Sequence, residues 1–359
     1  MDVCFFVERC KNCIKAASFE AEQVEQASVM RIPFQSAWQL KSHFAAIGLD
    51  FRIVQLTAGP LSGLFELGGH PSSPVLSIKT NQGLLFEGTR HPQWTPIALE
   101  NTHHLELHRV RGETVGHHCV HGFNRLVTES FFQISPGAHT TIGLLNSARL
   151  WSLIEQAKND QVFDVMETTN SVRVSPQLFE QIQALLRPDT TTEPELHEEL
   201  LQAALLNCLQ PGKASTVHSG DLTQGSHLMH ELIRWGTCHP TAVIKLEDLS
   251  RQLFASRSTI VQNCRTTFGL GPMALLKQIR LGQVQHTLSR PQLQQQIGCN
   301  NVQSIAAYYG FSSRNHFARD YRQLFGEAPS QTLQRAADPG MGVHSVSIAQ
   351  IPQMAIARR

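Results

Sequence analysis

The sequence lacks the features that would assign it to a membrane or secreted class. No run of apolar residues approaches the roughly 18 that a membrane-spanning helix needs. The opening residues MDVCFFVE hold an apolar stretch too short for a signal peptide, with an acidic residue where such peptides carry positive charge. We therefore expect a cytoplasmic protein that does not contact a membrane, and we expect its 8 cysteines to be free thiols.

Signatures of catalysis are absent as well. The sequence contains no nucleophile elbow, no phosphate-binding glycine loop and no paired-carboxylate arrangement. Cys10 and Cys13 form a single CxxC motif with only Cys4 nearby, which is too few ligands for a zinc site. We expect incidental thiols at these positions, no cofactor, and no enzyme activity.

What the chain does contain is an uneven distribution of charge. With 41% hydrophobic and 16% charged residues it is neither disordered nor collagen-like, and its 359 residues suffice for two or three domains. Residues 226–336 carry 12 Lys/Arg against 5 Asp/Glu, whereas residues 1–225 carry 16 against 23. A basic C-terminal region favours a polyanionic partner at that end, although charge alone also fits a solvated surface.

Strand-like and helix-like patterns divide the chain into parts. From about Phe34, short β-prone runs end at Gly, Pro or Asn, which is typical of a small antiparallel barrel or sandwich. Later the apolar period becomes helical, with helix starts predicted at Ser175-Pro176 and at Thr192. The expected α+β multidomain organisation is 1–33 unassigned, 34–140 β-rich, 141–210 a helical connector, 211–225 a linker, 226–336 all-α, and 337–359 a mobile tail.

The most specific signal is an internal repeat in the basic region. Asp248–Pro272 aligns with Ile305–Pro329, with identical Phe, Ser, Arg, Arg, Phe, Gly and Pro residues at matching positions. Each copy is predicted to be a helix, a tight turn and a second helix. Ser256 and Ser313 are expected to cap the second helices, and Gly310 to supply a left-handed turn residue.

The second helix of each copy has an apolar face and a polar face. The apolar residues are Ile260, Cys264 and Phe268 in the first copy and Phe317, Tyr321 and Phe325 in the second. The opposite stripes are Arg257, Ser258, Val261, Gln262 and Arg265, and Arg314, Asn315, Ala318, Arg319 and Arg322. Arg, Asn, Gln and small apolar side chains can read base edges in the major groove, and a terminal Arg can reach a phosphate.

A helix from Pro272 to Leu288 is predicted to join the two copies. About 18 residues make a rod of roughly 27 Å, close to the roughly 34 Å between successive major-groove faces of B-DNA. The alternative is that both stripes are solvated basic faces of a helical bundle. Because the stripe occurs twice, on either side of a rigid connection, we interpret the region as a binding site for double-stranded DNA.

These residues resemble the AraC/XylS family of bacterial transcription regulators. The resemblance covers residues 226–336, and its motifs include Leu249-Ser250, Gly269, Pro272, Arg280-Leu281, Ile305-Ala306, Gly310-Phe311-Ser312 and Pro329-Ser330. The stretch FARDYRQLFGEAPS is most similar to the subgroup that contains the ethanolamine-operon regulator. The resemblance implies two helix-turn-helix units that contact adjacent major grooves, in a homodimer that regulates transcription. Activation is commoner in the family, so it also implies RNA polymerase as a partner.

The sequence departs from the family at three places. Cys264 stands where an aromatic residue is usual, and Val284 where Ala is common. The connection 290–300 is longer than usual and rich in Gln. We therefore expect the first unit to pack less tightly and to read DNA less strictly than the second.

The resemblance also implies an effector-binding or dimerising domain ahead of the DNA-binding part. Residues 34–140 resemble the cupin-like barrel of the same subgroup, and a barrel of this size can enclose one small ligand. We therefore expect a small-molecule effector there. The helices of 141–210 are expected to form a dimer surface, with ordinary core as the alternative for their apolar residues.

Histidines gather in the β-rich part, and they leave a second interpretation open. They are His103, His104, His108, His117, His118 and His121. Neighbouring strands could bring three imidazoles together around a transition metal, giving a metal-dependent cupin enzyme or a metal sensor. His103 and His104 point to opposite faces of a strand, however, and neither Glu106 nor Glu113 completes a metal-site pattern. We expect no metal.

Overall fold

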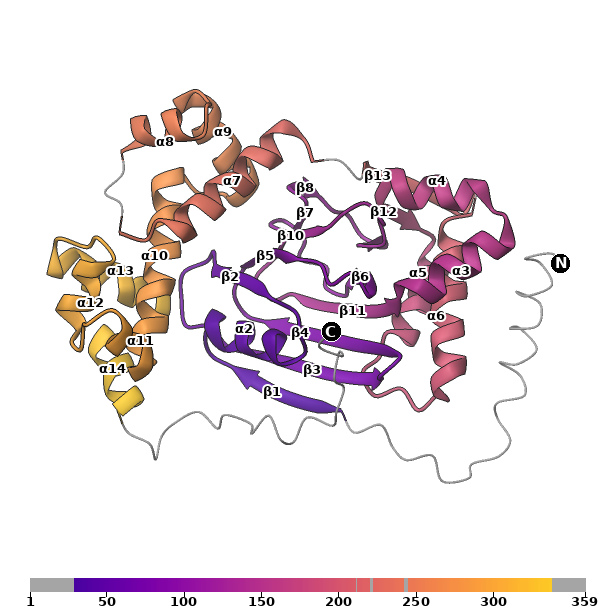
Figure 1. The fold of residues 1–359 in the computed structure, drawn as a ribbon, viewed down its shortest axis with the longest axis horizontal. Coiled ribbons are helices and arrows are strands. Elements are labelled where there is room, and N and C mark those ends of the chain that lie inside the picture. The colour runs from indigo at the N-terminus through magenta and orange to yellow at the C-terminus, as the bar shows by residue number, and fades with distance from the viewer. Residues whose placement is uncertain (1–28, 211, 220–221, 242–244, 338–359) are drawn as a thin grey trace.

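The computed structural model describes residues 29–210, 212–219, 222–241 and 245–337 (Figure 1). Its strands are β1 (Met30–Phe34), β2 (Phe51–Gln55), β3 (Gly63–His70), β4 (Ser73–Thr80), β5 (Leu84–Thr89), β6 (Trp94–Glu100), β7 (Arg109–Val110), β8 (Glu113–Thr114), β9 (Cys119–His121), β10 (Glu129–Ile134), β11 (His139–Asn146), β12 (Thr169–Val174) and β13 (Ala214–Ser219). A sheet-rich N-terminal part is thus confirmed.

The strands pair in two antiparallel sheets. The large sheet has the order β1-β3-β4-β11-β6-β9-β12-β13, and the small sheet has the order β2-β5-β10-β7-β8. Within the part of the chain that the structure describes, no strand of one sheet pairs with a strand of the other. The strands therefore do not close into the expected cupin-like barrel; the two sheets face each other around a shared core, which agrees with the sandwich alternative.

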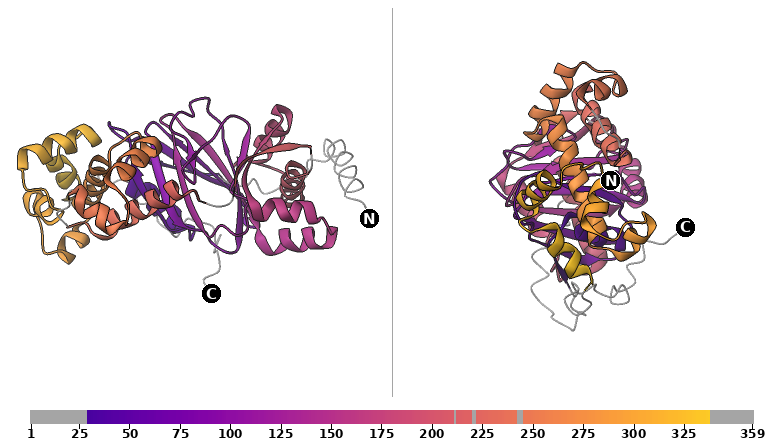
Figure 2. Two further views of the ribbon diagram at one scale, coloured as in Figure 1. Left: turned by 90° about the horizontal axis from the view of Figure 1, so that it is seen from above. Right: turned by 90° about the vertical axis from the view of Figure 1, so that its left-hand side faces the viewer.

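The helices are α2 (Ala37–Ala46), α3 (Ser147–Ala157), α4 (Asp160–Thr168), α5 (Pro176–Leu185), α6 (Pro194–Cys208), α7 (Gln224–Cys238), α8 (Leu246–Gln252), α9 (Arg257–Phe268), α10 (Pro272–Leu288), α11 (Pro291–Gln296), α12 (Val302–Tyr308), α13 (Arg314–Phe325) and α14 (Pro329–Ala337). The sheets form the middle of an elongated molecule, with α3–α6 at one end and α7–α14 at the other (Figures 1 and 2). No described helix is long and apolar enough to cross a membrane.

The stretch between the two expected domains contains strands that the sequence pattern did not reveal. β12 lies inside the expected helical connector, and β13 lies inside the expected linker. The two strands pair with each other and extend the large sheet. Ser and Thr residues suggested a linker, but Thr is β-branched and pairs well at the edge of a sheet. Ser175 does cap α5, whereas α6 begins after Glu193 rather than Thr192.

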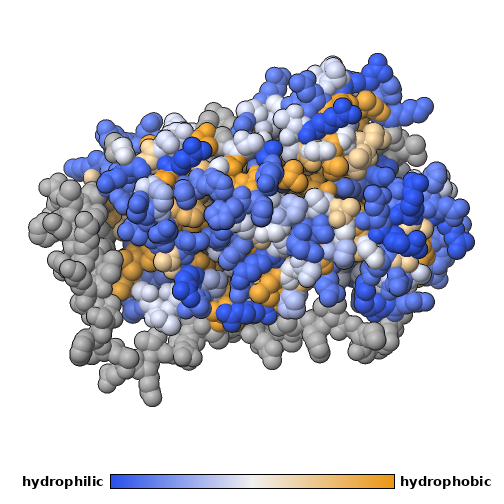
Figure 3. Space-filling model, turned by 180° about the vertical axis from the view of Figure 1, so that it is seen from behind, coloured by the Kyte–Doolittle hydropathy of each residue, from blue (hydrophilic) through white to orange (hydrophobic). Residues whose placement is uncertain are grey.

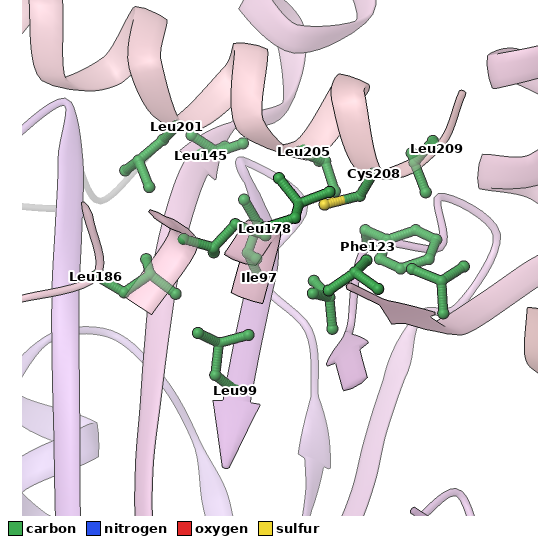
Figure 4. Packing of buried hydrophobic residues seen from close by; sticks show 14 of the residues in the cluster. Ile97, Leu99, Phe123, Leu145, Leu178, Leu186, Leu201, Leu205, Cys208 and Leu209 are labelled. Atoms are coloured by element: carbon green, nitrogen blue, oxygen red, sulfur yellow. The ribbon is translucent and has the colours of Figure 1, made fainter. Parts of the chain in front are cut away.

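Helices α3–α6 cover the large sheet with an apolar core. Leu201, Leu205 and Cys208 of α6 point toward Ile97 and Leu99 of β6 (Figure 4). All five side chains are almost fully buried. The apolar residues of 141–210 were expected to form either a dimer surface or ordinary core. Leu201, Leu205 and Cys208 belong to the core of the single chain.

Candidate nucleic-acid interface

The first helix-turn-helix unit consists of α8 and α9. Ser256 caps α9, and its hydroxyl accepts a hydrogen bond of 3.1 Å from the Thr259 amide. Ile260 and Cys264 are fully buried on the inward face of α9, as predicted. Burial raises the pKa of the Cys264 thiol to about 12, so the side chain packs here as a neutral group. The helix ends at Gly269, which has a φ of 69°.

The second unit consists of α12 and α13. Ser313 caps α13, and Gly310 in the preceding turn has a φ of 81°, which confirms both predictions. Phe317, Tyr321 and Phe325 are buried on the inward face, as predicted. The Tyr321 hydroxyl shares a hydrogen bond of 2.8 Å with the Thr332 hydroxyl of α14, which satisfies its polar end inside the core.

The turns of the two units differ by one residue. Four residues separate α8 from α9, and five separate α12 from α13. Phe254 therefore takes the left-handed place of Gly310, with a φ of 49° and 96% of its surface exposed. Phe311, which the sequence alignment pairs with Phe254, instead packs its ring 5.1 Å from that of Phe317. The sequence alignment of the two copies therefore matches their second helices correctly, but it is displaced by one residue for their first helices.

The two predicted stripes lie on the outer faces of α9 and α13. The exposed members are Arg257, Ser258, Gln262, Arg265, Arg314, Asn315, Arg319 and Arg322, while Val261 and Ala318 are half-buried. The surface of this helical end, on the right in Figure 3, is mainly hydrophilic. The structure thus brings each predicted stripe together on one helix, with side chains accessible to a partner.

Two of the stripe arginines form ion pairs with neighbouring acids. Arg257 Nη1 lies 2.7 Å from Glu247 Oε1, and Arg319 Nη2 lies 3.2 Å from Asp320 Oδ1. Lys277 of α10 also binds Asp320, at 2.8 Å. Burial raises the pKa of Asp320, but these two cations outweigh it and hold the pKa below its ordinary value. Asp320 therefore stays charged and orients Arg319 at the surface.

Helix α10 connects the units. It begins at Pro272, as predicted, and its 17 residues span about 26 Å. Leu276 and Ile279 pack with the first unit, and Leu281 and Val284 pack with the second. One rigid helix thus supplies part of the core of both units.

This geometry agrees with comparisons to known proteins. Residues 249–335 match a family model described as a helix-turn-helix domain. The HTH-type transcriptional activator RhaS of Escherichia fergusonii is 27% identical over 138 residues, which is 38% of this chain and 46% of RhaS. The XylDLEGF operon transcriptional activator 2 of Pseudomonas putida is 25% identical over 143 residues, 40% of this chain and 86% of that protein. The C-terminal region is a helix-turn-helix domain of the AraC/XylS family.

The two curated relatives named above match about two fifths of this chain, 38% and 40%. A solved structure of a probable AraC family transcriptional regulator from Rhodopseudomonas palustris CGA009 is 33% identical. It covers 31% of this chain and 97% of its own, with a TM-score of 0.27. The chain spans about half the length of RhaS, 46%.

The AraC/XylS-type domain docks on the small sheet, a contact that sequence reasoning missed. Val54, Leu85 and Phe131 of the sheet share one buried cluster with Met229 of α7 and Phe268 of α9. The Phe131 ring lies 5.4 Å from the His230 ring and 6.5 Å from that of Phe268. Because the two surfaces lie far apart in the sequence, no local sequence pattern predicts this contact.

A buried acid strengthens the same contact. Glu87 of β5 accepts hydrogen bonds from Arg52 at 2.7 Å and from His230 of α7 at 3.1 Å. Burial raises the pKa of Glu87, but the hydrogen bonds from His230 and Arg52 outweigh it and hold the pKa below its ordinary value. Glu129 lies 3.5 Å from the other ring nitrogen of His230.

Further contacts join the sheet-rich part to the second half of the AraC/XylS-type domain. Gln55 Nε2 donates to the Leu324 carbonyl at 3.0 Å. The Trp38 ring of α2 stacks on His286 of α10 at 5.8 Å and receives the Arg290 guanidinium on its face at 5.0 Å. Burial, with the charges of Arg290 and Lys41, lowers the pKa of His286 to about 4, so this ring is neutral at pH 7.

The histidines do not assemble into a metal site. Among the residues that the structure describes, no three His, Cys, Asp or Glu side chains are grouped so that they could hold a metal ion. His103, His104 and His117 are exposed, whereas His108 and His121 are buried. Cys4, Cys10 and Cys13 lie outside the described residues.

Proposed function

We propose that the protein is a sequence-specific DNA-binding transcriptional regulator. The observation that carries the proposal is a pair of exposed polar stripes, one on α9 and one on α13, at the two ends of the rigid α10. Each stripe would enter one of two adjacent major grooves. Because the region is basic, neutralisation of phosphates would supply much of the affinity, which would fall steeply with added salt.

The stripe residues divide into two proposed roles. Base contacts would come from Ser258, Val261 and Gln262 of α9, beside Arg257 in the same stripe, and from Arg314, Asn315, Ala318 and Arg319 of α13. Arg265 and Arg322 lie one turn further along their helices and would bind phosphates. Arg319 already has its guanidinium held at the surface by Asp320, so it is oriented before DNA arrives.

The other parts of the proposal concern regulation. Both curated relatives are named activators, which supports an activator that contacts RNA polymerase. We also propose a cytoplasmic homodimer in the subgroup of the ethanolamine-operon regulator, with a small-molecule effector bound in the sheet-rich part. A pocket between the two sheets supports the effector, because its wall is mostly apolar and also includes Arg90.

Selection of bound sites from random DNA with the purified full-length protein tests the DNA-binding function. We expect two half-motifs one helical turn apart. Arg319→Ala should cost about 1–3 kcal/mol on the selected site and relax the preference at one base pair. Arg322→Ala should weaken binding to selected and random DNA alike.

Arg187→Ala provides the matched control. This arginine is exposed in the loop between α5 and α6, outside the AraC/XylS-type domain, and its removal changes the net charge by the same amount. It should leave DNA binding unchanged. Equal loss on selected and random DNA for Arg319→Ala and Arg322→Ala would contradict the proposed roles.

A further inference from the structure

A small cavity lies between the two sheets. Its volume is about 90 Å³, and its wall is mostly apolar, with Phe44, Phe51, Trp94 and Phe132 among its lining residues. This is smaller than the roughly 150 Å³ cavity that holds a benzene ring in another protein. Its occupant must therefore have a compact apolar body.

Two arginines line this apolar cavity. Arg90 follows β5, and Arg111 follows β7. Arg90 donates from Nη1 to the Gly122 carbonyl at 2.7 Å and the Asn124 carbonyl at 3.2 Å, and from Nη2 to Asn170 Oδ1 at 3.4 Å. All three acceptors are neutral, and the buried Nε of Arg90 has no hydrogen-bond partner in the described part of the chain.

The charge of Arg90 is therefore uncompensated. Within the described residues, no carboxylate lies at ion-pair distance from it, and the charged group that acts on it is a second cation, Arg111. Burial, followed by the charge of Arg111, lowers the pKa of Arg90 to about 9. Buried charges in proteins are normally paired, because desolvation without a counter-ion is costly. The buried Glu100 lies 3.7 Å from His108 Nδ1 and accepts a hydrogen bond from Thr140, and it forms no ion pair with Arg90.

We propose that this cavity binds a small monocarboxylate with a compact hydrocarbon body. The carboxylate pairs with Arg90, and Arg111 adds a second positive charge. A guanidinium matches a carboxylate in geometry and charge, and the aromatic wall accepts the apolar remainder. The regulatory meaning of this site rests on the proposed function, whereas the binding itself does not.

One side chain connects the cavity to the AraC/XylS-type domain. Phe131 of β10 lines the cavity and also contacts His230 of α7 and Phe268 of α9. A ligand that displaces this ring therefore acts directly on the elements that hold the first helix-turn-helix unit. This gives the carboxylate a physical route to DNA affinity.

Isothermal titration calorimetry on the full-length protein tests the site. The probes are the straight-chain monocarboxylates from propionate to octanoate, each beside the alcohol of equal length. We expect affinity to rise with chain length and to fall once the chain exceeds the cavity, and we expect the best carboxylate to bind at least about tenfold more tightly than its alcohol. Equal affinity for acid and alcohol, or no binding by any probe, would overturn the proposal.

Variants separate a ligand-binding role of Arg90 from a structural one. Arg90→Gln should abolish the preference for acid over alcohol. Arg111→Gln should reduce this preference, and it serves as the test in case Arg90→Gln does not fold. Arg187→Gln, an exposed arginine already paired with Asp189 at 3.0 Å, is the matched control and should bind as the unchanged protein does. Retention of the preference in folded Arg90→Gln would also overturn the proposal.

DNA binding in the presence and absence of the best carboxylate separates this proposal from the proposed function. A ligand that binds through Arg90 without altering DNA affinity would remove the route through Phe131 and leave the site. Failure to select any DNA sequence would refute the proposed regulator, while the calorimetric result would stand on its own.

Discussion

The two helix-turn-helix units bury their second helices at matching positions, but they have different surroundings. The core of the first unit is continuous with the small sheet, because Ile260 and Phe268 share a cluster with Val54, Leu85 and Phe131. The core of the second unit is formed by α10, α12, α13 and α14. The repeated sequence thus encodes one supersecondary structure, while the position of the first unit depends on a surface more than 100 residues away.

This difference has a consequence for how a signal could reach DNA. The sheet-rich part reaches the second half of the domain through hydrogen bonds to the Leu324 carbonyl from Gln55 and Gly59, and through the stacking of Trp38 on His286 of α10. It contacts α7 and the first unit through a shared apolar core, and it contacts α7 through the Glu87–His230 pair as well. Because the first unit shares an apolar core with the small sheet, we expect movement of that sheet to affect the first unit more strongly than the second.

The largest expected effects come from deleting one buried ring in each unit. Phe268→Ala and Phe317→Ala each remove an almost fully buried phenyl ring, so each should lower the free energy of unfolding by about 3–5 kcal/mol. Phe268→Ala should also speed amide hydrogen exchange in β10, because Phe131 loses a packing partner. Phe317→Ala should leave exchange in β10 unchanged. Thermal or urea unfolding and exchange mass spectrometry give both readouts.

Equal acceleration of amide hydrogen exchange in β10 by both variants would contradict this difference between the units. That result would mean that the second unit is coupled to the sheet through α10 as strongly as the first unit is coupled through its core.

A smaller effect is expected from the buried acid at the docking surface. Glu87→Gln removes the carboxylate that accepts hydrogen bonds from Arg52 and His230, and it should lower the free energy of unfolding at pH 7 by about 1.5–3 kcal/mol. The folded-state pKa of Glu87 is below its ordinary value, so its contribution is present above that ordinary value. It is lost as the pH falls through the folded-state pKa. Urea unfolding should therefore show a shallower acid dependence for Glu87→Gln.

Glu198→Gln is the matched control for this variant. Glu198 is also buried and pairs with Arg149 at 2.7 Å, but it lies on α6 at the other end of the molecule. It should lower stability without exposing α7 to hydrogen exchange, whereas Glu87→Gln should expose α7. Protection of α7 unchanged by Glu87→Gln would show that the apolar cluster alone holds the first unit.

The sequence predicted what local patterns determine. Ser256, Ser313 and Gly310 were identifiable because caps and left-handed turns have residue signatures. The strands β12 and β13 and the docking surface were not, because each depends on pairing between distant segments. Arg90 could not be identified from the sequence for a similar reason. Its neighbours Thr89 and His91 form no motif, and only the fold places it in the wall of an apolar cavity.

The smallest expected effect concerns the turns, where removal of a side chain should raise the free energy of unfolding. Phe254 adopts a left-handed conformation that costs a side-chain-bearing residue roughly 1–2 kcal/mol, and its exposed ring recovers little of this by packing. Phe254→Gly should therefore raise the free energy of unfolding by about 1 kcal/mol, even after the greater freedom of glycine in the unfolded chain. Gly310→Ala at the matching place should lower it by a similar amount, measured by the same urea titration. Destabilisation by Phe254→Gly would instead mean that the exposed ring makes a contact that compensates for its backbone strain. The first unit would then differ from the second in its turn as well as in its attachment to the sheet.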